Sequence, residues 1–202
     1  MKLYYFPGAC SLAAHIVLQE AGADFVLEKV DLGKKKTASG EDYLSVNPKG
    51  YVPALRLNND DILTEVGTII QYVADQNTDS RLAPKLGTIE RYHLMEWLNF
   101  IATEIHKQFS PLFNPKVSQE WKDSQLVQLG RRFDYLSTHL EGKDFLMGAT
   151  YTVADAYLFT VLNWCNYLKV DLVKWPALAQ YLARVGARPA VQATLKAEGL
   201  AR

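Results

Sequence analysis

Cysteine is scarce in this chain, with two residues among 202. So few thiols exclude a disulfide scaffold and a cysteine-rich zinc site. No apolar run reaches the roughly 18–20 residues that a membrane span needs, and the N-terminus lacks the apolar stretch of a signal peptide. An excess of one charge is also missing: 22 basic and 22 acidic residues cancel, which argues against bulk electrostatic binding to nucleic acid or anionic membranes. We therefore expect a cytoplasmic protein without a metal site.

The first third of the chain alternates between strand and helix patterns. A short apolar run, stopped by Pro7-Gly8, precedes a helical pattern that ends at Gly22, and a second apolar run follows. This order predicts a βαβ unit with parallel strands, followed by a hairpin around Asn58–Asp61. The expected elements are strands at 3–6 and 25–31, a helix at 11–21, hairpin strands at 54–57 and 62–64, and a helix ending near 75.

From about Gly87 the pattern is helical to the end of the chain. Thr152 and Asp155 have the spacing of a capping box, in which each residue satisfies a backbone N–H of the other. The expected helices are one long helix at 89–109, ended by Ser110-Pro111, and further helices at 118–140, 176–185 and 189–196. Between them, the capping box precedes the apolar run 156–162, and an apolar helix is expected over 161–168. We predict an α/β domain over residues 1–80 and an all-helical domain over 87–202, with a linker in 77–86.

Cys10 lies between a predicted strand and the start of a predicted helix. A thiol there feels the positive end of the helix dipole and unpaired backbone N–H groups, which favour the thiolate. The carboxyl ends of parallel strands are also where α/β folds bind ligands. The alternative is a small buried apolar residue, which is the common fate of a free cysteine and the one we expect for Cys165.

A polar stripe marks the long predicted helix. Asn99, Thr103 and His106 are spaced i, i+4 and i+7, so they share one helical face, and Lys107 flanks them. Such a stripe is commonly just the solvated face, but the neighbouring positions are apolar, and the stripe would suit a ligand beside the other domain. His106 would then influence a nearby thiol or carry protons. The other histidines, His15, His93 and His139, have no metal-ligand spacing and are expected on the surface or in the core.

Three shorter features complete the candidates. Val52-Pro53 precedes a strand, and base rates for X–Pro bonds alone predict a trans peptide there. Glu65 precedes a helix start, where backbone N–H groups favour anions. Lys34-Lys35-Lys36 by composition predicts a solvated loop.

Several segments taken together resemble a glutathione S-transferase. They are MKLYYFPGACS at 1–11, VNPKGYVPAL at 46–55, Thr64-Glu65 and YTVADAY at 151–157, and the likeness continues through Arg188-Pro189 to residues 197–200. The Gly-Ala-Cys-Ser form, with His106-Lys107, resembles the bacterial beta class. The resemblance implies a thioredoxin-like N-terminal domain followed by an all-helical domain that contributes a hydrophobic substrate pocket. It also implies glutathione as co-substrate and a homodimer.

The resemblance assigns roles to individual residues of the first domain. Cys10, next to Ala9, would lie beside the glutathione sulfur, and a cis Val52-Pro53 bond would expose Val52 to pair with the cysteinyl part of glutathione. Lys35 would reach the glycyl carboxylate, while Glu65 and the amide of Val66 would hold the γ-glutamyl end. Val66 departs from the Ser or Gly that beta-class proteins commonly have there, so only its main chain would bind.

From the helical domain, the resemblance implies that the polar stripe approaches the thiol, with Glu104 and Lys107 beside it and His106 in a catalytic role. Our first hypothesis is transfer of glutathione to electrophilic carbons of apolar compounds. Their pocket would be lined by Phe109, Leu112, Phe113, Trp164 and Tyr167, although core packing is the alternative for each aromatic residue taken singly.

Two rival functions stay open. A thiol is a poor donor to a thiolate but a good partner in a mixed disulfide, so the second hypothesis is glutathione-dependent thiol–disulfide exchange at Cys10. The third is a non-catalytic module that binds glutathione, apolar ligands or partners with negligible turnover.

Overall fold

The computed structural model describes residues 1–201, and contacts divide the chain into two compact units. Unit 1 comprises Met1–Ala83 and Arg188–Arg202, and unit 2 comprises Pro84–Ala187. This grouping differs from the predicted division at the last helix, α10 (Pro189–Ala197), which belongs to unit 1 by its contacts. Each unit is described separately below.

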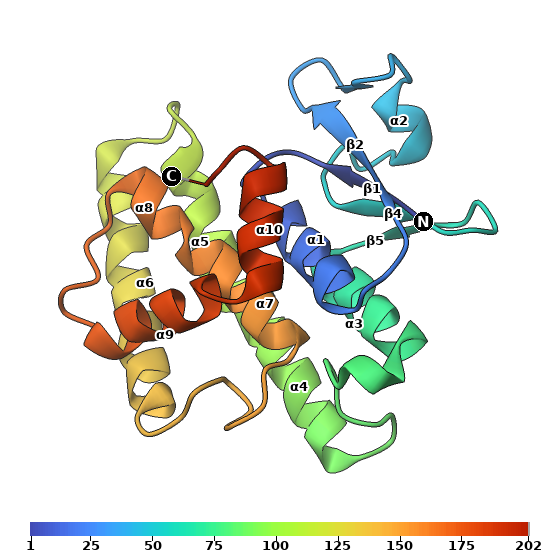
Figure 1. Ribbon diagram of the computed structural model, residues 1–202. Coiled ribbons are helices and arrows are strands. Elements are labelled where there is room, and N and C mark those ends of the chain that lie inside the picture. The colour runs from blue at the N-terminus through green and yellow to red at the C-terminus, as the bar shows by residue number, and fades with distance from the viewer. Residues whose placement is uncertain (202) are drawn as a thin grey trace. The chain divides into compact units, whose positions relative to one another are not determined.

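Unit 1 is built on a five-stranded sheet in the order β3-β2-β1-β4-β5 (Figure 1). Strand β1 pairs in parallel with β2, and the other neighbours are antiparallel. The predicted βαβ unit and hairpin are both present, with ends within two residues of expectation. The strands are β1 (Lys2–Tyr5), β2 (Val26–Asp31), β3 (Lys36–Thr37), β4 (Ala54–Arg56) and β5 (Ile62–Thr64).

The sheet of unit 1 buries side chains on both of its faces. Successive residues of β1 point to opposite faces, so Leu3 and Tyr4 are both fully buried on different sides. Tyr4 packs in a cluster with Tyr43 of α2 and with Val52. Helices α1 and α3 pack against each other, and α10 packs along α1 (Figure 1). The helical elements are α1 (Ser11–Glu20), α2 (Tyr43–Val46), α3 (Val66–Gln76), the short 3-10 turn η1 (Thr78–Ser80) and α10.

Unit 2 is entirely helical, as predicted. Ser118 caps α6 by accepting from the Trp121 amide, and Asp155 accepts from the Thr152 amide at 2.8 Å, which completes the predicted capping contact. The fully buried side chains of α7 form the centre of the unit. Its elements are α4 (Ile89–Phe100), η2 (Ile101–His106), α5 (Lys107–Phe109), η3 (Ser110–Phe113), α6 (Gln119–Leu140), α7 (Val153–Leu162), α8 (Trp164–Leu168) and α9 (Pro176–Gly186).

The prediction of one regular α-helix over 89–109 is wrong in its middle. Residues Ile101–His106 form a π-helix, η2, between α4 and α5. The Thr103 hydroxyl donates to the Asn99 carbonyl at 3.0 Å, and a side chain that bonds the i−4 carbonyl competes with the α-helical ladder. The polar stripe therefore crosses two kinds of helix, so its 3.6-residue spacing does not hold over η2. π-Helical turns are rare in proteins, and those that occur are frequently found at functional sites.

Among residues 1–201, no helix combines the length and the apolarity that crossing a membrane requires.

Candidate functional site

Cys10 lies immediately before α1, at the end of the turn that leaves β1. Its backbone is in the right-handed helical region, and the amide of Ala13 already donates to its carbonyl at 3.2 Å. The side chain is partly exposed, and the thiol donates to the Val52 carbonyl oxygen, 3.1 Å from Sγ. The fold thus brings together Cys10 and Val52, two residues that the family resemblance assigned to one ligand.

The Val52–Pro53 peptide is cis, which contradicts the trans bond that base rates predict and agrees with the family resemblance. The loop before it is fixed by side chains of unit 1. The Tyr43 hydroxyl and the Asn47 amide both donate to the Tyr51 carbonyl, at 2.7 and 2.8 Å. Burial raises the pKa of Tyr43 to about 12, so its hydroxyl stays a donor at neutral pH. Sequence reasoning missed both supports, because nothing in the spacing of Tyr43 and Asn47 indicates where their side chains point.

Lys35 lies in the same region rather than in an open solvated loop. Its ammonium donates to the Gly50 carbonyl at 2.9 Å, and its backbone has a positive φ of 55°. Gly50 also has a positive φ, 69°, which glycine adopts at little cost because it has no Cβ. Lys34 and Lys36 are exposed, but Lys36 belongs to β3, so the composition-based prediction of a solvated loop holds for Lys34 alone.

Glu65 precedes α3 in an unusual backbone conformation. Its φ is 70° and its ψ is 127°, and a non-glycine residue there stores strain of the kind that clusters at ligand sites. Its exposed carboxylate pairs with the Lys49 ammonium at 2.6 Å, and Lys49 also donates to the Thr64 hydroxyl at 2.9 Å. Val66 begins α3, and its side chain is buried.

His106 of unit 2 has a built environment. Its Nδ1 lies 2.7 Å from the Tyr157 hydroxyl, and its ring packs edge-on against Trp164, with 5.0 Å between ring centroids. Phe109 and Phe113 pack edge-on against the same Trp164, at 5.6 and 5.5 Å. Trp164 thus gathers three of the predicted residues, and Tyr157 is a partner that the sequence analysis quoted in a motif without giving it a role.

The remaining polar candidates of unit 2 are on the surface or already paired. Asn99, Thr103 and Lys107 are exposed, and Thr103 uses its hydroxyl on the helix backbone. Glu104 forms an ion pair with Arg132 at 2.6 Å, with both side chains about one-third exposed.

The five predicted pocket residues differ in environment. Phe109 is fully buried and Trp164 nearly so, whereas Phe113 and Tyr167 are each 48% exposed. Leu112 lines a cavity of about 590 Å³ with Leu126, Leu129 and Phe133 of α6, and Lys122, Lys169 and Lys174 also contribute to its lining. Core packing therefore accounts for Phe109. Leu112, Phe113 and Tyr167 keep exposed surface that a ligand can reach, and Trp164 lies just below the surface.

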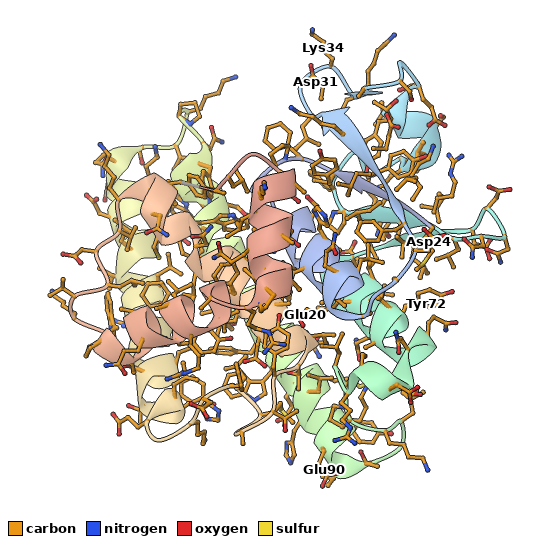
Figure 2. The ribbon with its side chains drawn as sticks, viewed as in Figure 1. Glu20, Asp24, Asp31, Lys34, Tyr72 and Glu90 are labelled. Atoms are coloured by element: carbon orange, nitrogen blue, oxygen red, sulfur yellow. The ribbon has the colours of Figure 1, made fainter. Side chains whose placement is uncertain are left out.

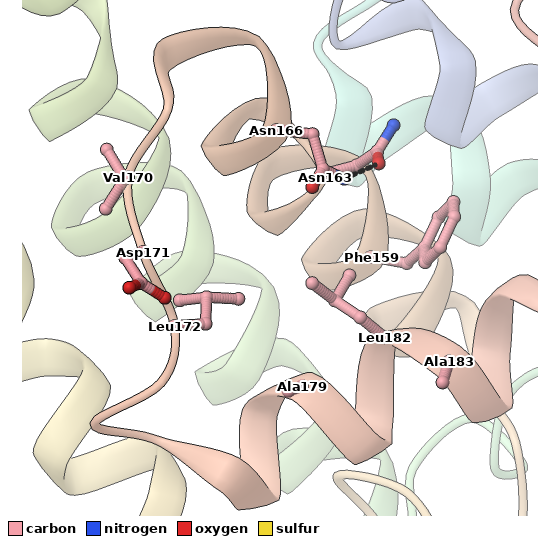
Figure 3. A pocket seen from close by; sticks show the side chains of 9 residues that line it. All are labelled: Phe159, Asn163, Asn166, Val170, Asp171, Leu172, Ala179, Leu182 and Ala183. Carbon is pink, nitrogen blue, oxygen red and sulfur yellow. Dashed lines mark hydrogen bonds between the residues drawn. The ribbon is translucent and has the colours of Figure 1, made fainter.

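A second cavity of unit 2, of about 450 Å³, is lined by residues of α7, α9 and the segment after α8 (Figure 3). Asn166 donates to Asn163 at 2.8 Å on one of its walls, and Leu172 and Leu182 point into it from facing sides. None of the predicted site residues lines this cavity.

Cys165 is buried, as expected for a core residue, and burial raises its thiol pKa to about 12. Within residues 1–201 no group of three or more His, Cys, Asp or Glu side chains is placed to hold a metal ion.

Comparison with known proteins agrees with this arrangement. The N-terminal domain of glutathione S-transferase matches residues 1–75, and its C-terminal domain matches residues 100–189. The chain is 48% identical, over 99% of its length and all of the relative, to glutathione S-transferase GstA of Escherichia coli O157:H7.

Two solved structures are equally similar in fold. A sphingomonad glutathione S-transferase complexed with glutathione has a TM-score of 0.96 and 48% identity, with both chains fully covered. A bacterial beta class glutathione S-transferase of Sphingomonas chungbukensis has a TM-score of 0.96 and 46% identity, over 99% of this chain and all of that one. The predicted α/β plus all-α fold class and the predicted resemblance are therefore confirmed, and the chain belongs to the glutathione S-transferase family.

Proposed function

We propose that this member of a transferase family binds glutathione along Cys10, Val52 and Glu65 of unit 1 and conjugates it to apolar electrophiles. The observation that carries the proposal is the 3.1 Å hydrogen bond from Cys10 Sγ to the Val52 carbonyl. It puts the partly exposed Cys10 thiol beside the carbonyl of Val52, just before β4. An extended peptide thiol bound there would pair with the Val52 main chain and place its sulfur next to that of Cys10.

The two ends of glutathione find opposite charges nearby. The Glu65 carboxylate suits the ammonium of the γ-glutamyl end. The helix start at Val66, next to it, suits the carboxylate of the same end. Lys35 suits the glycyl carboxylate, because its ammonium already lies 2.9 Å from the Gly50 carbonyl, two residues before Val52. Ala9 and Pro53 flank the two central contacts. The proposed roles of Asn99, Thr103, Glu104, His106 and Lys107 stay predictions, as do those of the five pocket residues.

The conjugation itself balances simply. The glutathione thiolate attacks an electrophilic carbon, a carbon–sulfur bond forms, and the leaving group departs with the electron pair of the bond that breaks. Since a free thiol is only a few per cent ionised at neutral pH, the protein must favour the thiolate. The positive end of α1 provides part of that stabilisation.

The partly exposed thiol of Cys10 also suits a second function, thiol–disulfide exchange. The Cys10 thiolate would attack the glutathionyl sulfur of a mixed disulfide, releasing the other thiol and leaving glutathione on Cys10. A second glutathione thiolate would then attack that sulfur, forming glutathione disulfide and restoring Cys10. The hydrogen bond to Val52 uses the protonated thiol, so Cys10 must lose that proton before it attacks.

Intact mass spectrometry after treatment with glutathione disulfide tests the site. We expect one reductant-reversible adduct on the wild type and on Cys165→Ala, and none on Cys10→Ala. An adduct that persists in Cys10→Ala would contradict the assignment. Conjugation of a chlorodinitrobenzene, measured on the same three proteins, separates the two activities: Cys10→Ala should lose exchange and keep part of the conjugation. Glutathione binding without either activity would support the non-catalytic alternative.

The apolar electrophiles and the homodimer follow from the family resemblance, and the cytoplasmic location is expected from the sequence patterns; all three are proposals. Light scattering coupled to size-exclusion chromatography tests the dimer directly.

A further inference from the structure

A buried polar network in unit 1 lies outside the site described so far. Glu198 follows α10, and its carboxylate is fully buried. Oε1 lies 2.9 Å from Nδ1 of His15, and Oε2 accepts from the Gly8 amide at 2.9 Å. One carboxylate therefore joins α10 to the second turn of α1 and to the turn that leads into Cys10.

His15 is as buried as its partner. Its ring lies edge-on to Tyr5 and Phe25, with centroid separations of 6.2 and 5.5 Å. Its Nε2 finds no hydrogen-bond partner among residues 1–201. Because an ionised carboxylate only accepts, the hydrogen between Glu198 and His15 belongs to Nδ1. A histidine that leaves one nitrogen unpaired in the core is oriented by its single strong contact, which here is Glu198.

The Gly8 amide is a sensitive point of the turn before Cys10. Gly8 has a positive φ of 72°, and the next amide, that of Ala9, donates back to the Phe6 carbonyl at 3.1 Å. The Ser11 hydroxyl bridges the Phe6 amide and carbonyl from the first turn of α1. These contacts hold the turn from within, and Glu198 reaches the Gly8 amide from a segment 190 residues away along the chain.

A second ion pair fixes the other end of the same two helices. Arg188 precedes α10 and donates to both carboxylate oxygens of Glu20 at the end of α1, at 2.6 and 2.9 Å. Glu20 is labelled in Figure 2, where α10 runs beside α1. The helices are thus antiparallel, with Arg188–Glu20 at one end and Glu198 with His15 and Gly8 at the end that carries Cys10. Only the Glu198 end contacts the turn before the thiol.

We propose that Glu198 is a positioning residue for Cys10: its buried carboxylate, oriented by His15, fixes the Gly8 amide and with it the turn that presents the thiol. The inference rests on the proposed function only in taking Cys10 as the working thiol. It predicts that removing the acceptor at Glu198 moves Cys10 without removing it. Loss at the Glu20 end, in contrast, weakens the same helix pair and leaves the turn in place.

The test compares Glu198→Gln, Glu198→Leu and Glu20→Leu. Glutamine keeps an oxygen for the Gly8 amide, and its NH₂ can donate to His15 once the ring carries its hydrogen on Nε2. Leucine of similar size removes the acceptor. Glu20→Leu is the matched control, because it removes the Arg188 ion pair from the same helix contact. If Glu198→Leu does not fold, Glu198→Asp replaces it, since its shorter side chain keeps the charge and withdraws from Gly8.

Two measurements are made on each folded variant: the rate of Cys10 alkylation by iodoacetamide, followed by mass spectrometry, and KM and kcat for glutathione conjugation. We expect Glu198→Leu to change the Cys10 alkylation rate and to raise the glutathione KM, each by about tenfold. Glu198→Gln should stay within about threefold of wild type, and Glu20→Leu should lower the melting temperature with both readouts unchanged.

Unchanged alkylation and KM in folded Glu198→Leu, or equal changes in Glu20→Leu, would overturn the proposal and leave Glu198 as a purely structural residue. The alkylation rate needs no glutathione. A wild type that fails to bind glutathione would therefore overturn the proposed function and still leave the positioning of Cys10 measurable.

Discussion

The Lys49 ammonium lies 2.6 Å from a carboxylate oxygen of Glu65, the residue with the strained backbone before α3. The two side chains are 52% and 69% exposed, so water screens the pair. A cation that already holds Glu65 competes with the substrate ammonium that Glu65 is proposed to bind. We therefore expect Lys49, which does not belong to the predicted set, to affect glutathione recognition.

Replacing Glu65 and Lys49 separately distinguishes binding from stability. Glu65→Gln should weaken glutathione binding by about tenfold, because a charge-assisted hydrogen bond of roughly 1.5 kcal/mol is lost. Both Glu65→Gln and Lys49→Gln should lower the free energy of unfolding by less than about 1 kcal/mol, as for other exposed pairs. Titration calorimetry and urea unfolding provide the two values. Equal loss of binding in both variants would show that the ion pair itself, and not Glu65 alone, holds the ligand.

The Tyr157 hydroxyl orients His106 through the 2.7 Å contact to Nδ1. Tyr157→Phe keeps the buried ring and removes the hydroxyl that makes this contact. If His106 contributes to turnover, kcat for conjugation should fall about fivefold, which corresponds to one hydrogen bond of about 1 kcal/mol. His106→Ala should cost more. Identical kcat values in the wild type and both variants would remove His106 from the catalytic set.

Cys165 should make the protein sensitive to alkali. Its pKa rises from 9.0 to about 12 on burial, so folding favours the neutral thiol. Stability from this source is fully present below pH 9, the ordinary value, and is lost as pH rises toward about 12. Chemical unfolding across that window should show a shallower pH dependence in Cys165→Ala than in Cys10→Ala. Parallel curves for the two variants would contradict the prediction. Burial also raises the pKa of Tyr43, so this tyrosine contributes to both curves.

Asp155 should be one of the most sensitive positions for the stability of unit 2. Its fully buried carboxylate accepts from the amides of Leu146 and Thr152 at 2.8 Å each and from the Tyr181 hydroxyl at 2.9 Å. Asp155→Ala removes the carboxylate from these donors, while Tyr181 keeps its 3.3 Å contact to the backbone carbonyl of residue 155. The free energy of unfolding should fall by about 3 kcal/mol. Asp144→Ala, in the same unit but with a 62% exposed side chain, is the control and should cost less than about 1 kcal/mol. Comparable urea midpoints for the two variants would refute this ranking.

Local patterns predicted the elements well because apolar periodicity and caps are local. The capping box at Thr152 and the end of α1 before Gly22 lie where the residues indicate. The π-helical turn at Ile101–His106 was not predictable, since the Thr103 hydroxyl is compatible with both windings until the helix packs. The cis bond at Val52–Pro53 likewise follows from the family resemblance and not from the two residues themselves.

Partners far apart in sequence were beyond the same reasoning. Lys49 and Glu65 are 16 residues apart, and His15 and Glu198 are 183 apart. His15 was expected on the surface or in the core, and its burial confirms the second. Nothing in its neighbours indicates a carboxylate partner from the other end of the chain. Cys10, in contrast, was identified because a strand end and a helix start are themselves local signals.

The grouping of residues 188–202 with unit 1 has a consequence for the order in which the molecule matures. A ribosome releases residues 84–187 before it releases α10, so the helical unit has its whole sequence available while the sheet unit still lacks a segment. Until Glu198 emerges, His15 lacks its carboxylate partner and the Gly8 amide lacks the acceptor that Glu198 provides. Cys10 is therefore among the first residues to be synthesised, but the turn that precedes it gains its contact to Glu198 only when the last residues emerge.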